Sequence, residues 1–75
     1  MRPEVVISRA LGVEPGAITD DSSSATLQNW DSMGHITLIL ELESHYGVHF
    51  SIEESLVMKD CATIKQLLVT KGVRW

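Results

Sequence analysis

The segment from Ser32 to Tyr46 constrains the fold more than any other part of this chain. Its apolar residues recur with helical periodicity. It directly follows Asp31, a residue type that caps helix N-termini, and Gly47 supplies a stop signal. On a helical projection its apolar side chains cover an arc of about 220°, whereas a helix packed on one side of a bundle needs roughly 100°. The sequence therefore predicts a helix over 32–46 with more apolar surface than one-sided packing requires.

The surplus apolar residues lie along one edge of this predicted helix and begin immediately after Ser32. An apolar edge flanked by carboxylates is typical of a docking surface. The same residues would also suit a helix buried on two sides, because a small domain must bury most of its apolar surface. Periodicity leaves both interpretations open. Leu38, Ile39, Leu42 and Tyr46 suffice for the core, and the candidate partner-binding residues are Met33, Ile36, Leu40, Glu41 and Glu43.

Three further helices are predicted on either side of this segment. The first begins at Pro3 and ends at Gly12. Ser51 can cap a short third helix, and Asp60 can cap the last helix. Residues 13–30 contain turn and polar residues with spaced apolar anchors, which predicts a long loop, ordered but irregular, laid over the core. We expect an all-α four-helix bundle with three main helices, a short third helix and a long first loop. The loop anchors are Val13, Ile18, Leu27 and Trp30.

The chain length allows one domain, spanning residues 1–75. Cys61 is the only cysteine, so there is no internal disulfide, and its helical spacing predicts a core position. No apolar run approaches the roughly 20 residues that cross a bilayer, and the N-terminus lacks the apolar core of a secretory signal. We expect a cytoplasmic, monomeric protein with no membrane association.

The acidic residues are concentrated in the middle of the chain. The net charge is −4, but no Lys or Arg occurs between Ala10 and Met58. This distribution excludes a role that depends on attraction to nucleic-acid phosphates, and it predicts electrostatic steering of basic partners. A solvated acidic surface kept for solubility is the alternative. The acidic residues of this stretch are Glu14, Asp20, Asp21, Asp31, Glu41, Glu43, Glu53 and Glu54.

Ser32 is the main candidate for chemistry. A hydroxyl at a helix N-terminus lies where backbone N–H groups and the helix dipole favour an anion such as a phosphate ester. Serine is also common in the first turn of a helix simply because it can cap it. The position alone leaves both interpretations open.

The segment Trp30-Asp31-Ser32-Met33 resembles the Asp-Ser-Leu/Met signature of the phosphopantetheine-binding acyl and peptidyl carrier proteins. The resemblance covers nearly the whole chain. It includes the first helix, the long loop with Ile18-Thr19-Asp20-Asp21, the serine-led second helix, the short third helix and the closing helix around Ala62-Thr63-Ile64.

This resemblance implies a free-standing acyl or aminoacyl carrier that has no enzymatic activity of its own. In the family, a separate Mg²⁺-dependent transferase moves 4′-phosphopantetheine from coenzyme A to the serine, and the thiol of this arm holds substrates as thioesters. Ser32 would be the attachment point, Asp31 the adjacent acidic motif residue, and the second helix the surface recognised by the transferase, a loading ligase and downstream biosynthetic enzymes. Thr37 and Ser44 stand where fatty-acid carriers often have acidic residues, so polyketide or other specialised biosynthesis is equally compatible.

Three other interpretations of these residues compete with the carrier resemblance. Ser32 and His35 are neighbours on a helix and could form a nucleophile–base pair, but no Gly-x-Ser-x-Gly elbow accompanies them. His45 and His49 have a spacing that can bind a metal on a helix, but Gly47 lies between them, which favours two surface histidines. An unmodified α-helical protein-interaction domain shares every feature except the arm.

Overall fold

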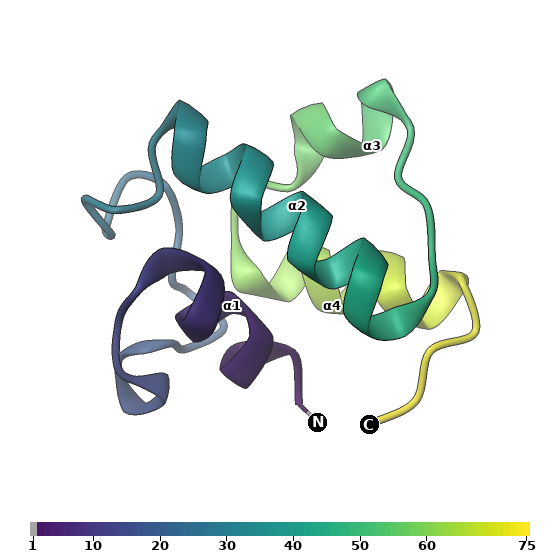
Figure 1. The fold of residues 1–75 in the computed structure, drawn as a ribbon, viewed down its shortest axis with the longest axis horizontal. Helices are drawn as coiled ribbons and strands as arrows, with labels where there is room; N and C mark the ends of the chain where they lie inside the picture. The colour runs from purple at the N-terminus through teal and green to yellow at the C-terminus, as the bar shows by residue number, and fades with distance from the viewer. Residues whose placement is uncertain (1) are drawn as a thin grey trace.

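The computed structural model describes residues 2–75, which fold into four helices and one turn of 3-10 helix (Figure 1). The all-α prediction is confirmed, because these residues form no strand, only an isolated β-bridge between Ser23 and Asp60. None of the helices over residues 2–75 combines the length and apolar character needed to cross a membrane. The elements are α1 (Pro3–Leu11), η1 (Pro15–Ala17), α2 (Ser32–Tyr46), α3 (Ile52–Val57) and α4 (Cys61–Thr70).

The helix boundaries follow local signals in the sequence. Helix α1 ends at Gly12 and α2 at Gly47, and both glycines adopt the left-handed conformation, with φ of 70° and 66°. Glycine enters this region without the steric penalty that a Cβ imposes. Helix α3 begins with a complete capping box, in which the Ser51 hydroxyl and the Glu54 carboxylate bond to each other's backbone N–H. These ends were predicted from residue type alone.

The core is formed where α1 packs against α2 and α4. From α2, Leu38 and Leu42 are fully buried, and Ile39 and Tyr46 pack partly buried against them, as the helical projection predicts. Cys61 is also buried, which confirms its predicted core position. The buried apolar residues are Val6, Ile7, Leu11, Ile18, Trp30, Leu38, Leu42, Phe50, Met58, Cys61, Ile64, Leu68 and Val73.

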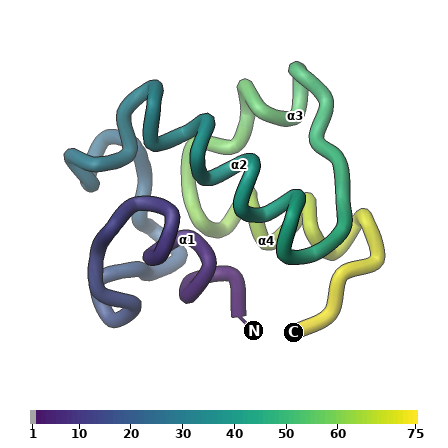
Figure 2. Tube along the Cα trace, viewed as in Figure 1, coloured from purple at the N-terminus to yellow at the C-terminus, as the bar shows by residue number. Residues whose placement is uncertain are grey.

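The connection between α1 and α2 follows a largely irregular path over the fold (Figure 2). Hydrogen bonds hold it in place. Backbone N–H groups at the start of α4 donate to this loop, Cys61 to the Ser22 carbonyl at 3.0 Å and Ala62 to the Asp20 carbonyl at 3.2 Å. The loop thereby satisfies donors that have no partner inside the helix. Its predicted anchors Ile18 and Trp30 are buried, and Val13 and Leu27 are partly buried. The 3-10 turn η1 was not predicted.

Candidate functional site

At the start of α2, Asp31 caps the helix and Ser32 exposes its hydroxyl. Asp31 is the N-cap, and its carboxylate accepts a hydrogen bond of 2.8 Å from the Gly34 backbone N–H. Ser32 is the first helical residue and is exposed, and its hydroxyl makes no hydrogen bond within residues 2–75. The capping explanation for a residue at this position therefore applies to Asp31, and the Ser32 hydroxyl is available to a partner.

Gly34 allows the first turn of α2 to lie directly on the preceding loop. A Cβ at this position would overlap the Asn29 carbonyl oxygen and come within 3.2 Å of the Leu11 Cδ2 atom. The Asn29 side chain also donates a 2.9 Å hydrogen bond to the Leu11 carbonyl at the end of α1. This role was missed from the sequence. The signal that could have found it is a glycine inside a helical pattern, where it costs about 1 kcal/mol relative to alanine.

His35 connects three parts of the chain near Ser32. The Trp30 indole N–H donates to His35 Nδ1 at 2.9 Å, and His35 Nε2 lies 2.9 Å from the Ser55 carbonyl oxygen in α3. An indole nitrogen can only donate, so Nδ1 must accept, and Nε2 therefore carries the proton and donates to Ser55. Both ring nitrogens are thus occupied, and the structure does not assemble Ser32 and His35 as a nucleophile–base pair.

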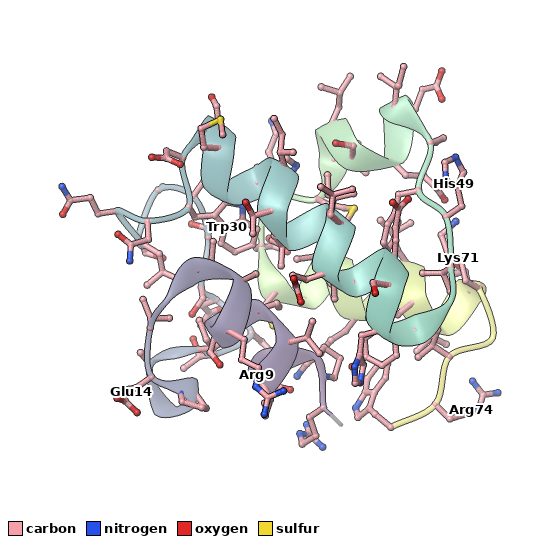
Figure 3. The ribbon with its side chains drawn as sticks, viewed as in Figure 1. Arg9, Glu14, Trp30, His49, Lys71 and Arg74 are labelled. Atoms are coloured by element: carbon pink, nitrogen blue, oxygen red, sulfur yellow. The ribbon has the colours of Figure 1, made fainter. Side chains whose placement is uncertain are left out.

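A groove of about 380 Å³ lies beside Ser32, between the start of α2, helix α3 and the loop that precedes α2. Its lining combines hydroxyl groups, the Asp31 carboxylate, the His35 imidazole, one ammonium group and apolar surface. Trp30 forms part of its wall, behind the first turns of α2 (Figure 3). The lining includes Ser32, His35, Ser55, Leu56 and Lys59.

The apolar edge of α2 is exposed, which resolves the two interpretations of its periodicity. Met33 is 70% exposed, Ile36 53% and Leu40 59%. These three side chains are therefore not core residues. Helix α3 also exposes apolar side chains, namely Ile52, Leu56 and Val57.

The two glutamates predicted to flank this edge have different environments. Glu41 is exposed, whereas Glu43 is half-buried and accepts a 2.8 Å hydrogen bond from the Phe50 backbone N–H. His49 Nδ1 lies 3.2 Å from the same Glu43 oxygen. Glu43 thus holds the connection after α2, a role that sequence periodicity could not reveal, and Glu41 is the freer of the two carboxylates.

The remaining histidines and the cysteine lie apart from this site. His45 and His49 are exposed, as predicted, and His45 contacts the Tyr46 ring edge-on at 4.8 Å between centroids. Residues 2–75 contain no group of three or more side chains that could bind a metal ion. Burial raises the pKa of the Cys61 thiol to about 11 and so suppresses its thiolate.

Part of the acidic stretch is neutralised within the molecule. Asp20 pairs with Lys65 at 2.6 Å, and Glu54 pairs with Lys71 at 2.9 Å. Five other carboxylates are exposed and form no ion pair within the described residues, so they can act on approaching molecules. These are Glu14, Asp21, Asp31, Glu41 and Glu53.

The sequence matches no model of a known protein family, and a search of the curated proteins found no match either.

Proposed function

We propose that this chain is a carrier protein that receives 4′-phosphopantetheine on Ser32 and presents acyl or aminoacyl groups to partner enzymes. The observation that carries the proposal is the exposed Ser32 hydroxyl, free of intramolecular hydrogen bonds, on the first residue of a capped helix beside a groove. The resemblance of residues 30–33 to the carrier signature, and of the helix order to that family, points to the same chemistry.

The start of α2 is chemically suited to a phosphodiester. The first N–H groups of a helix have no intrahelical acceptor, and the positive end of the helix dipole favours an anion. Asp31 already accepts from the Gly34 N–H, so the N–H groups of Ser32 and Met33 remain for a phosphate on the Ser32 oxygen. When bound, the arm would supply a terminal thiol that holds the cargo as a thioester.

The Ser32 oxygen is the only reacting atom that this chain supplies to the modification step. The Ser32 oxygen forms a bond to the phosphorus of the phosphopantetheine moiety of coenzyme A, and the phosphoanhydride bond to adenosine bisphosphate breaks. The hydroxyl proton passes to a base on the transferase, because both nitrogens of His35 are occupied by Trp30 and Ser55. The chain's own contribution is to expose the hydroxyl at a fixed helix end.

The exposed edge of α2 is the proposed contact for the transferase, the loading ligase and downstream enzymes. Met33, Ile36 and Leu40 begin one residue after Ser32, so an enzyme that covers them also reaches the arm. Glu41 adds an exposed carboxylate that would attract a basic docking surface. The cargo, whether fatty acyl, polyketide or aminoacyl, is then selected by the loading enzyme.

Incubation with coenzyme A, Mg²⁺ and a broad-specificity phosphopantetheinyl transferase tests this proposal. We expect the intact mass of the wild type to increase by one arm and that of Ser32→Ala to stay unchanged. Ser44→Ala is the matched control, because Ser44 is another exposed serine of α2, and it should be modified like the wild type.

An unmodified wild type, in an assay that loads a known carrier, would contradict the proposal. It would favour the second candidate, an α-helical interaction domain in which Ser32 stays free. The observation behind that candidate is the same exposed apolar edge of α2, which can bind a partner without an arm.

A further inference from the structure

Helix α3 is the least anchored helix of the molecule. It has six residues, none of them buried, and Ile52, Leu56 and Val57 are all exposed. Its capping box joins Ser51 to Glu54 and so stabilises the helix without attaching it to the rest of the fold. Packing of its own side chains therefore cannot fix where α3 lies relative to α2.

The position of α3 depends on attachments at its ends and on two polar contacts. The flanking residues Phe50 and Met58 are buried. Lys71 of the C-terminal segment binds the Glu54 carboxylate at 2.9 Å and lies beside the 47–51 connection (Figure 3). These contacts hold the ends of α3 and the side of α3 that faces α4.

The contact that joins α3 directly to the start of α2 is the hydrogen bond from His35 to Ser55. The His35 Nε2–H donates to the Ser55 carbonyl at 2.9 Å, and that carbonyl belongs to the last turn of α3. The Trp30 indole, from the buried end of the loop, fixes the ring by donating to Nδ1. The imidazole thus connects the buried Trp30 to a weakly packed helix, and it lines the groove beside Ser32.

We propose that His35 is a positioning residue that holds α3 against the start of α2 and so sets the groove next to Ser32. Ser32, Ser55 and Leu56 all line this groove, so a displaced α3 alters the surface that an enzyme meets when it approaches the serine. The consequence for arm transfer rests on the proposed function, whereas the positioning of α3 does not.

The first test uses the unmodified protein, so its outcome does not depend on the arm. In the wild type, ¹⁵N NMR of the His35 ring should show the proton on Nε2 and none on Nδ1 at neutral pH. Amide exchange in residues 52–58 should be about five- to tenfold faster in His35→Phe than in the wild type, because one net hydrogen bond is lost. Exchange in α1 should be unchanged.

Two further variants separate positioning from general damage. Glutamine can accept and donate at the two ends of its amide, so His35→Gln should restore part of the slow exchange. His45→Phe is the control, because His45 is exposed on the same helix and its ring contact is with Tyr46. It should exchange like the wild type.

The second test measures arm transfer with coenzyme A and the transferase. His35→Phe should raise the KM for the carrier about five- to tenfold while kcat changes less, and His35→Gln should recover most of the loss. A proton on Nδ1 in the wild type, or equal exchange over 52–58 in wild type and His35→Phe, would overturn the proposal. If the wild type accepts no arm, the proposed function fails, and the exchange data alone decide the role of His35.

Discussion

Four residues at the start of α2 have four different structural roles. Asp31 caps the helix, Ser32 leaves a hydroxyl exposed, Gly34 admits the loop backbone, and His35 reaches α3. Because these tasks depend on different atoms, single substitutions can separate them. A variant that destabilises the turn need not remove the hydroxyl, and a variant that removes the hydroxyl need not destabilise the turn.

Gly34→Ala should lower the free energy of unfolding by about 1–3 kcal/mol, because an added methyl group must displace the backbone at Asn29. Urea denaturation measures this change. Gly16→Ala is the matched control, since a Cβ at Gly16 meets nothing within 4 Å, and its effect should stay within about 0.5 kcal/mol. Equal free energies of unfolding for Gly34→Ala and the wild type would show that the loop backbone at Asn29 can move away from the methyl group without loss of stability.

At the residue scale, the sequence predicts features that depend only on residues nearby in the chain. The cap at Asp31 and the helix end at Gly47 are local chemistry, and both were predicted. The partners of His35 were not, because Ser55 is twenty residues away and its carbonyl reaches the ring only after α3 is in position. The close approach at Gly34 also depends on where the loop lies.

At the scale of elements, α2 has one side in the core and one edge exposed. Periodicity correctly selected the core side, where Leu38 and Leu42 are fully buried. It could not decide whether the opposite edge was covered, since that depends on the length and placement of neighbouring helices. Helix α3, with six residues, leaves Met33, Ile36 and Leu40 exposed.

Leu40→Asp and Leu42→Asp make a matched pair on this helix. Leu40 is exposed, so Leu40→Asp should change the free energy of unfolding by less than about 0.5 kcal/mol, whereas Leu42→Asp buries a charge in the core and should unfold the domain. Circular dichroism during thermal unfolding distinguishes the two.

Leu40→Asp also tests the docking edge. Under the proposed function, Leu40→Asp should reduce the rate of arm transfer about five- to tenfold, because the substitution places a charge on the proposed docking edge. Met33→Asp should behave alike. An unfolded Leu40→Asp would mean that the edge belongs to the core, and an unchanged transfer rate would remove Leu40 from the docking surface.

At the scale of the whole molecule, two lysines of the C-terminal region connect elements that are distant in sequence. Lys65 reaches Glu4 of α1 and Asp20 of the loop, each at 2.6 Å, and Lys71 reaches Glu54 of α3. The uneven charge distribution is visible in the sequence but these pairs are not, because ion pairing over such separations follows from the packing of helices. The consequence is that acid should weaken several connections together.

Stability should fall as the pH decreases below about 4.5. The pKa of Glu54 is lowered from the model-compound value of 4.5 by hydrogen bonding from the Ser51 backbone and then by Lys71. Burial raises the pKa of Glu4, but hydrogen bonds, that from Lys65 foremost, outweigh burial and lower it. Groups whose pKa is lower in the folded state stabilise it above their unfolded pKa, and this contribution is lost as the pH falls through the folded value.

Urea midpoints measured from pH 7 to pH 3 test this dependence. Glu54→Gln should be less stable than the wild type at pH 7 and should lose less stability on acidification. Glu53→Gln is the control, because Glu53 is exposed and unpaired within the described residues, and it should parallel the wild type. Parallel curves for Glu54→Gln and the wild type would contradict a role for the Glu54–Lys71 pair.

Because Cys61 is buried, the folded polypeptide presents no reactive thiol to reagents in solution. Cys61 is the only cysteine of the chain, it is inaccessible, and its pKa of about 11 leaves almost no thiolate at neutral pH. A thiol-directed alkylating reagent applied to the folded protein should therefore leave the polypeptide unlabelled, and under the proposed function it would label only the thiol of an attached arm. If the proposed function holds, a cargo thioester would block that label, so one reagent would distinguish empty from loaded carriers without any engineering of the chain.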